Sequence, residues 1–322
     1  MNKDIIFLTP VCTHNIWGGT RLNREFGYPI EGDDIGECWG ISAHPNGDGT
    51  VASGAYKGMK LSELWEKHPE LFGDTGMDRF PLLVKIIDAK DDLSIQVHPD
   101  DAYAKAHENG SLGKTECWFI LDCKENATLV VGHNAKTKEE LEQMIHEGRW
   151  KEFIREIPIK PGDFIQIDPG TVHAIKGGTL LLETQQSSDI TYRVYDYDRL
   201  SNGKPRQLHI TQSIDVITVP AKSAENSVVH TEKKDDAIQQ LICCPYYTVY
   251  RIDVEHRVET WQDKPFVLMS VVEGEGTLNG TPLKKGDHLI LPDGYGKVEL
   301  QGRMQILSLI HISEPTRLRC IS

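Results

Sequence analysis

Three side chains of types that bind metal ions occur close together in the chain, at Gln96, His98 and Glu116. Gln96 and His98 are two residues apart, so on a β-strand both side chains leave the same face and can reach one point. Glu116 adds a carboxylate, which joins imidazole and an amide oxygen around divalent cations. A histidine with a glutamate some way off is also commonly a surface pair, so these three residues alone leave metal binding open.

The residues around these side chains favour strands. Ile95 and Val97 alternate with the polar positions, and β-branched residues suit a strand that turns one face to a core. Further along, residues 160–174 give a turn, a strand, a second turn at Pro169-Gly170 and then His173 on a new strand. This order resembles the second metal-binding motif of the cupin barrel, where two strand segments bring their ligands together in the mouth of a jelly roll. The resemblance makes His173 the fourth ligand.

Several longer runs extend the resemblance to a family. The chain is similar to type I mannose-6-phosphate isomerases, specifically the short bacterial form, over nearly its whole length. The runs that carry this similarity are Ile16-Trp-Gly-Gly19, Gly36-Glu-Cys-Trp39, Ser94-Ile-Gln-Val-His-Pro-Asp-Asp101, Gly113-Lys-Thr-Glu-Cys-Trp118, Pro169-Gly-Thr-Val-His-Ala174 and Glu183-Thr-Gln-Gln-Ser-Ser-Asp-Ile-Thr-Tyr-Arg-Val-Tyr-Asp196.

The resemblance implies an enzyme, an aldose-ketose isomerase that interconverts D-mannose 6-phosphate and D-fructose 6-phosphate through a cis-enediolate. One zinc ion per chain would polarise the substrate oxygens. A neutral amide, two imidazoles and one carboxylate leave such a site with net positive charge, which favours an anionic intermediate. The implied zinc ligands are Gln96, His98, Glu116 and His173.

Two basic residues are implied as catalytic. Lys114 is two residues before Glu116, so on a strand it shares the face of that ligand, and the resemblance makes it a residue that orients the substrate or takes part in proton transfer. Arg193 lies among neighbours typical of a buried strand, so its guanidinium should point into the cavity. By resemblance it is the active-site arginine.

The substrate-binding candidates are Arg199, Asp189, Glu183 and Trp17. Arg199 offers a planar fork to a phosphate, but it could equally pair with a nearby acid. Asp189 and Glu183 are candidates for proton transfer or for fixing Arg193, and the sequence does not choose between these roles.

We expect a mainly β fold with two cupin-like jelly-roll barrels and a small helical insertion in the N-terminal half. The expected divisions are a catalytic metal-binding cupin domain at 1–220, with helical segments at about 60–72 and 137–155; a linker at 221–240; a second cupin-like barrel without metal at 241–312; and a non-native or disordered tail at 313–322.

The second barrel is inferred from an internal repeat. Residues 285–292 resemble residues 160–170 in their Gly-Asp turn and following strand. Counting from Gly286 as from Gly162, the position that matches His173 is Lys297. We therefore expect this barrel to bind no metal and to serve in packing or in oligomer formation.

The composition of the chain limits the kinds of binding partner that it can have. The 322 residues carry a formal net charge of −13 at pH 7 without a marked basic block, which argues against nucleic acid and leaves a small sugar phosphate as the expected partner. The chain has no secretory signal and no apolar run that could cross a bilayer, so we expect a cytoplasmic protein without a membrane partner. Whether it is a monomer or a homodimer stays open.

Two other classes of protein fit part of this pattern. A non-catalytic sugar-sensing cupin would keep the metal ligands but would not need Lys114 and Arg193. An iron oxygenase would use two histidines and one carboxylate, but it would leave open for oxygen the position that Gln96 would fill.

Overall fold

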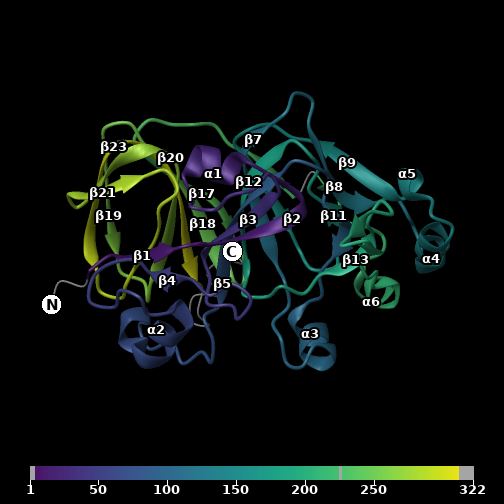
Figure 1. Ribbon diagram of the computed structural model, residues 1–322, viewed down its shortest axis with the longest axis horizontal. Coiled ribbons are helices and arrows are strands. Elements are labelled where there is room, and N and C mark those ends of the chain that lie inside the picture. Colours follow the sequence, from purple (N-terminus) through teal and green to yellow (C-terminus); the bar gives the residue numbers. More distant parts are fainter. Residues whose placement is uncertain (1–3, 225–226, 312–322) are drawn as a thin grey trace.

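The computed structural model describes residues 4–224 and 227–311 and consists mainly of antiparallel β-sheets (Figure 1). The seven-stranded sheet has the order β16 (Val228–His230), β10 (Asp163–Ile167), β7 (Glu116–Cys123), β12 (Thr179–Gln186), β5 (Leu82–Ala89), β2 (Val11–Gly19), β3 (Ile35–Ile41). The five-stranded sheet has the order β13 (Tyr192–Tyr195), β6 (Ile95–Val97), β11 (His173–Ala174), β8 (Thr128–His133), β9 (Ile154–Pro158).

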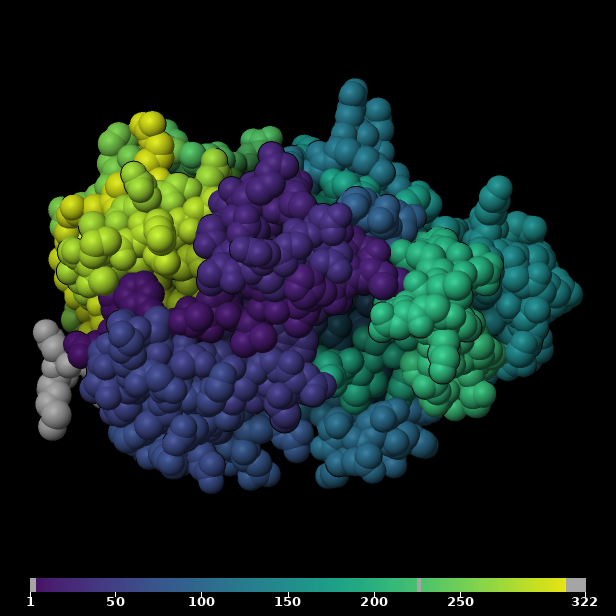
Figure 2. Space-filling view, in the orientation of Figure 1, coloured from purple at the N-terminus to yellow at the C-terminus, as the bar shows by residue number. Residues whose placement is uncertain are grey.

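The nine-stranded sheet contains the C-terminal strands together with two strands from the N-terminal part. Its order is β17 (Ala237–Cys243), β18 (Tyr247–Val254), β23 (Gly296–His311), β20 (Val267–Leu278), β22 (His288–Leu291), β1 (Ile6–Thr9), β4 (Thr50–Val51), with β19 (Arg257–Gln262) on β23 and β21 (Thr281–Lys284) on β20. A small hairpin joins β14 (Leu200–Ser201) to β15 (Lys204–Pro205). Figure 2 shows the N-terminal segments, in purple, lying between the yellow C-terminal part and the teal part.

The seven- and five-stranded sheets pack face to face over a shared apolar core. This core includes Trp118 and Ile165 from the first sheet and Leu129 and Val131 from the second. The nine-stranded sheet encloses a separate core. Its other face packs on the seven-stranded sheet through a third cluster.

Strand β5 shows how the packing dictates the sequence pattern. Every residue from Leu82 to Ala89 is buried, because one face of the strand joins the cluster with Leu82 and Val84 and the other joins the cluster with Ile87. A strand covered on both faces has no solvent side and is apolar along its length. Lys85 shares the face of Ile87, so its charge is turned toward the five-stranded sheet.

The helices lie around the sheets. They are α1 (Arg21–Phe26), α2 (Leu61–Lys67), the 3₁₀ helix η1 (Pro69–Phe72), α3 (Asp101–His107), α4 (Lys138–His146), α5 (Trp150–Phe153) and α6 (Ile210–Val216). Helix α4 begins after Thr137, whose hydroxyl accepts a hydrogen bond from the Glu140 amide. Helices α4 to α6 pack on the outer face of the five-stranded sheet. None of the helices in the described ranges is long and apolar enough to span a bilayer.

Two features bear on the expected divisions of the chain. Residues 221–240 contain β16 and the start of β17, and β16 pairs with β10 of the seven-stranded sheet. Strand β1 pairs with β22, so the N-terminus contributes to the C-terminal sheet. The tail expected at 313–322 lies outside the described residues.

Candidate active site

Two histidines and a glutamate converge between the seven- and five-stranded sheets. Glu116 begins β7, His98 follows β6 directly, and His173 begins β11. One Glu116 oxygen lies 3.4 Å from His98 Nε2 and the other lies 3.3 Å from His173 Nε2. The two Nε2 atoms are 3.1 Å apart. All three side chains are buried, so their polar atoms face one another away from solvent.

The hydrogen bonds around the histidines leave this cluster ready for a cation. His98 Nδ1 donates to the carbonyl of Ile190 at 2.8 Å, and His173 Nδ1 donates to the carbonyl of Thr171 at 2.9 Å. These bonds fix the tautomers so that both Nε2 atoms present lone pairs to each other. The buried Glu116 oxygens accept no hydrogen bond of good geometry. Lone pairs that face one another with no proton between them suit the binding of a divalent metal ion.

Gln96 lies beside this cluster. It is directly opposite His173 in the β6–β11 pair, and its Nε2 lies 3.2 Å from His173 Nε2. The two ends of a glutamine amide exchange by a half-turn of the side chain. That turn would direct Oε1 at the cluster.

Lys114 places a positive charge beside the negative charge of Glu116. Its Nζ lies 2.7 Å from Glu116 and 3.1 Å from His98 Nε2. Burial disfavours the charged form of Lys114, but Glu116 and Glu183 outweigh this effect and raise its pKa. Burial acts against the Glu116 carboxylate too, yet Lys114 and the two histidines hold the pKa of Glu116 well below its usual range. The lysine is therefore charged and the carboxylate is ionised.

The match to known families covers both ends of the chain. Residues 5–119 match the catalytic domain of type I phosphomannose isomerases, and residues 237–311 match the cupin domain of mannose-6-phosphate isomerases. Mannose-6-phosphate isomerase ManA of Bacillus subtilis is 52% identical over 94% of this chain and 97% of its own length. The chain belongs to the type I phosphomannose isomerase family.

Other relatives agree with this assignment. The mannose-6-phosphate isomerase of Streptococcus mutans is 47% identical over 94% of this chain and 97% of its own length. The crystal structure of mannose 6-phosphate isomerase from Bacillus subtilis superposes with a TM-score of 0.89 at 48% identity, covering 95% of this chain and 99% of that one. The expected family and the expected mainly β cupin fold are confirmed.

The register of the strands places Arg193 on the face of the five-stranded sheet from which His173 projects. Arg193 on β13 is directly opposite Gln96 on β6, and Gln96 is directly opposite His173 on β11. Directly opposite residues of neighbouring strands project from the same face. Arg193, Gln96 and His173 therefore form a row across the five-stranded sheet.

The guanidinium of Arg193 is held by the segment after β15. The Nη1 atom of Arg193 donates to the Gln207 carbonyl at 2.8 Å. The backbone amide of Arg193 donates to His209 Nδ1 at 3.2 Å. The buried Nε of Arg193 has no hydrogen-bond partner. Burial and the nearby Arg206 lower its pKa, yet an arginine stays charged.

Arg199 is engaged by an acid, one of the two possibilities that the sequence left open. Its Nη2 donates to Asp196 at 2.6 Å, and its Nη1 donates to the Asp92 carbonyl at 2.5 Å. Arg206, which sequence reasoning missed, also donates to Asp196, from Nε at 2.7 Å. A role of Arg199 in binding substrate stays a prediction.

Glu183 lies in a buried network on the inner face of the seven-stranded sheet. Trp118 Nε1 donates to Glu183 at 3.0 Å, and Lys85 Nζ lies 3.4 Å from its other oxygen. Lys85 also lies 3.7 Å from Glu37 and 4.7 Å from the centre of the Trp39 ring. Burial and Glu116 raise the pKa of Glu183.

Lys85 and Glu37 are the members of this network that sequence reasoning missed. A signal was present for Lys85, because a single lysine stands in the apolar run Leu82–Ala89. A buried lysine needs an acidic partner. Glu37 lies in the run Gly36-Glu-Cys-Trp39 that carries the family resemblance, but its contact with Lys85 depends on the pairing of β3 with β5.

Asp189 and Trp17, the other two substrate-binding candidates, form no hydrogen bond or ion pair with Glu183 or Lys85 among the described residues. Asp189 lies 3.5 Å from His44 Nε2 and accepts a hydrogen bond from Asn46 at 2.5 Å. Its side chain is 40% exposed, so it lies nearer solvent than Glu183. Trp17 is buried in the core between the seven- and five-stranded sheets. Their assignment to substrate binding stays a prediction.

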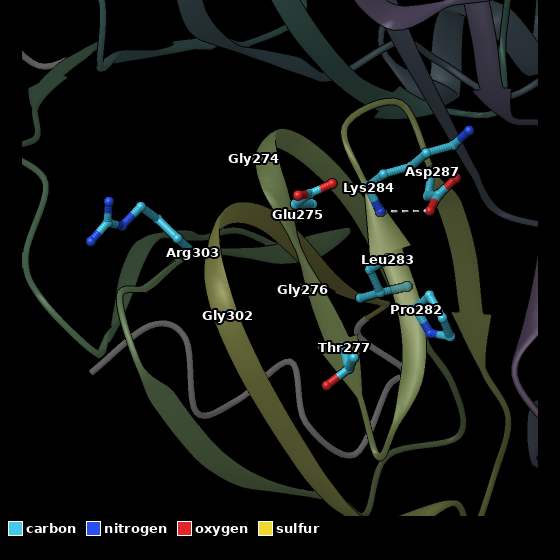
Figure 3. Close-up of a pocket in the computed structure, with 10 residues that line it drawn as sticks. All are labelled: Gly274, Glu275, Gly276, Thr277, Pro282, Leu283, Lys284, Asp287, Gly302 and Arg303. Carbon is cyan, nitrogen blue, oxygen red and sulfur yellow. Dashed lines mark hydrogen bonds between the residues drawn. The ribbon is translucent and has the colours of Figure 1, made fainter.

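Figure 3 shows the residues that line an open hollow in the nine-stranded sheet, and none of them belongs to the cluster of His98, Glu116 and His173. The volume of the hollow is about 820 Å³. It is lined by residues of β20, β21 and β23, among them Glu275, Lys284 and Arg303, and by Asp287 from the turn between β21 and β22. The lining has no histidine or cysteine. The backbone amide of Lys284 donates to the Asp287 carboxylate at 2.8 Å.

His288 is the buried histidine of this sheet and serves as a test of the metal assignment. Tyr28 Oη lies 2.8 Å from its Nε2, and Ser270 Oγ lies 2.8 Å from its Nδ1. Burial lowers the pKa of His288 to about 4, so the ring is neutral at pH 7. Both of its nitrogens have hydroxyl partners and none of these partners is a carboxylate.

We expect His288→Ala to leave metal content and turnover unchanged. The variant should be less stable by roughly 1–3 kcal/mol, because the buried Tyr28 and Ser270 hydroxyls each lose their hydrogen bond to the imidazole. Metal analysis, steady-state kinetics and thermal unfolding of the purified variant check these expectations. Loss of stoichiometric metal from the folded variant would contradict them.

Proposed function

We propose that the chain is a zinc-dependent isomerase that interconverts D-mannose 6-phosphate and D-fructose 6-phosphate through a cis-enediolate. The observation that carries the proposal is the buried cluster of His98, Glu116 and His173, whose lone pairs face one another beside the charged Lys114. The names of the curated relatives support mannose 6-phosphate as the substrate.

Gln96, His98, Glu116 and His173 are the residues that would hold one zinc ion. When bound, zinc supplies positive charge that polarises substrate oxygens and stabilises negative charge on them. A fourth protein ligand from Gln96 favours zinc over a mononuclear iron site, which keeps positions open for oxygen. The carbonyl acceptors of Ile190 and Thr171 would keep both imidazoles oriented.

The basic residues would divide two tasks. Lys114, whose ammonium lies at the cluster, would donate a hydrogen bond to a substrate oxygen as negative charge develops on it. Arg193 would supply a second positive charge, from the end of the row Arg193–Gln96–His173 that lies opposite His173. In a chain with a formal charge of −13, this local charge lets an anionic sugar phosphate enter.

Glu183 is the group that we assign to proton transfer between C2 and C1. Its pKa is raised, as suits a carboxyl that takes and returns a proton. Its partners are Lys85 and Trp118 rather than Arg193, which favours this role over that of fixing Arg193. Glu183→Gln should lower kcat while the metal stays bound, and unchanged kcat would remove Glu183 from the reaction.

Turnover in deuterated water tests the reaction class. We expect mannose 6-phosphate to yield fructose 6-phosphate that carries solvent deuterium on carbon, because an enediolate exchanges its proton through the enzyme. Mass spectrometry of the product measures this. Binding without turnover would instead indicate a sensor, and oxygen consumption would indicate an oxygenase. Product that is still free of deuterium after prolonged equilibration of the two sugar phosphates would contradict the enediolate.

A further inference from the structure

A pair of thiols lies on the face of the seven-stranded sheet that is turned away from the side chains of His98, Glu116 and His173. Cys12 on β2 and Cys38 on β3 are directly opposite each other in an antiparallel pair, and β2 and β3 run side by side in Figure 1. Their Sγ atoms are 2.8 Å apart, closer than two unbonded sulfur atoms normally lie. The two side chains therefore already point at each other.

The backbone at this pair fits a disulfide. Directly opposite residues of antiparallel strands have Cα atoms about 4.5–5.5 Å apart. Disulfides join Cα atoms about 4.4–6.8 Å apart. Cys12 and Cys38 meet this requirement through the register of their strands, so a bond between them needs little movement of the main chain.

The two thiols differ in access. Cys38 is fully buried, at 0% exposure, in the cluster under α1 that includes Leu22 and Phe26. Cys12 is partly buried at the edge of the same cluster. Burial and the neighbouring Cys12 raise the pKa of the Cys38 thiol. An oxidant from solvent therefore meets Cys12 first, and Cys38 is placed to react second.

We propose that Cys12 and Cys38 form an oxidation site that closes an intramolecular disulfide when the protein meets a peroxide. The Cys12 thiol loses its proton and its sulfur attacks one peroxide oxygen. The O–O bond breaks, Cys12 becomes a sulfenic acid, and the leaving hydroxide takes up the thiol proton and departs as water. The Cys38 sulfur then attacks the Cys12 sulfur, the S–O bond breaks, and a second water leaves. Two thiols lose two electrons, and one hydrogen peroxide is reduced to two waters.

The site adjoins the catalytic face through one strand. Glu37 and Trp39 flank Cys38 and project from the opposite side of β3, where Trp39 Nε1 donates to Glu37 at 2.7 Å. Both contact Lys85, the partner of Glu183. A Cys12–Cys38 bond would fix the strand that carries them. It also closes a loop between positions 26 residues apart, which raises resistance to unfolding.

Peptide mass spectrometry tests the proposal. Trypsin releases residues 4–21 and 25–57 as separate peptides with one cysteine each. After the full-length protein is treated with hydrogen peroxide and its free thiols are alkylated, we expect these two peptides to be joined, with the mass of two hydrogens lost, and to separate on reduction. The oxidised protein should unfold at a higher temperature than the reduced protein.

Single variants test the order of the two steps. In Cys38→Ser, the sulfenic acid on Cys12 should persist and be trapped by dimedone. In Cys12→Ser, Cys38 should stay reduced. The matched control Cys123→Ser, which removes another partly buried thiol, should keep the cross-link. Alkylation of both Cys12 and Cys38 in wild-type protein whose Cys123 has been oxidised would overturn the proposal.

Discussion

His98→Ala and His173→Ala should each lose the bound metal and isomerase activity together. Either change removes one Nε2 donor from a cluster in which Glu116 lies 3.3–3.4 Å from both histidines. The remaining carboxylate and imidazole would bind a divalent ion much less tightly. We expect activity to fall by at least about 10³-fold, because metal polarisation is worth several kcal/mol.

Metal per chain, measured by elemental analysis, and kcat, measured by a coupled assay, check this prediction. His288→Ala is the matched control, since it also removes a buried histidine but lies outside the cluster. Circular dichroism would show that each variant is folded. Folded His98→Ala or His173→Ala protein that kept metal with wild-type affinity would contradict the ligand assignment.

Arg193→Lys should cut kcat by about 10²-fold or more while metal content stays intact. The change keeps a positive charge but removes the planar fork. Arg193 is placed by its register with Gln96 and by its hydrogen bond to the Gln207 carbonyl. A lysine would make that bond with a different geometry, and a positioned charge in the transition state is typically worth this much.

Steady-state kinetics separate two roles for Arg193. If it acts in the transition state, kcat falls; if it only anchors the phosphate, KM rises with kcat little changed. Arg155→Lys is the control, because Arg155 on β9 also donates to backbone carbonyls, those of Val131 and Lys222. Wild-type kcat and KM in Arg193→Lys would remove Arg193 from the site.

Local patterns in the sequence predicted the parts of the site that strand geometry controls. Gln96 and His98 are two apart on one strand, and Lys114 is two before Glu116, so their shared faces follow from the two-residue period. The position of His173 next to Gln96 depends on the pairing of β6 with β11. Only the resemblance to cupins gave that position before the structure.

Pairings between distant segments were out of reach of the sequence. Strand β1 joins β22 across most of the chain, and no local pattern encodes such a partner. Strand β16 is short and has exposed residues, so its sequence resembles a solvated loop until β10 pairs with it. The contact of Lys85 with Glu37 and Glu183 likewise depends on the register of neighbouring strands.

Removal and return of the metal tests the central claim most directly. Purified protein would be treated with a chelator, assayed for formation of fructose 6-phosphate from mannose 6-phosphate, and then titrated with zinc. We predict that activity is lost with the metal and returns in full at one zinc per chain. Full isomerase activity in metal-free protein, or no activity at one zinc per chain, would contradict the account.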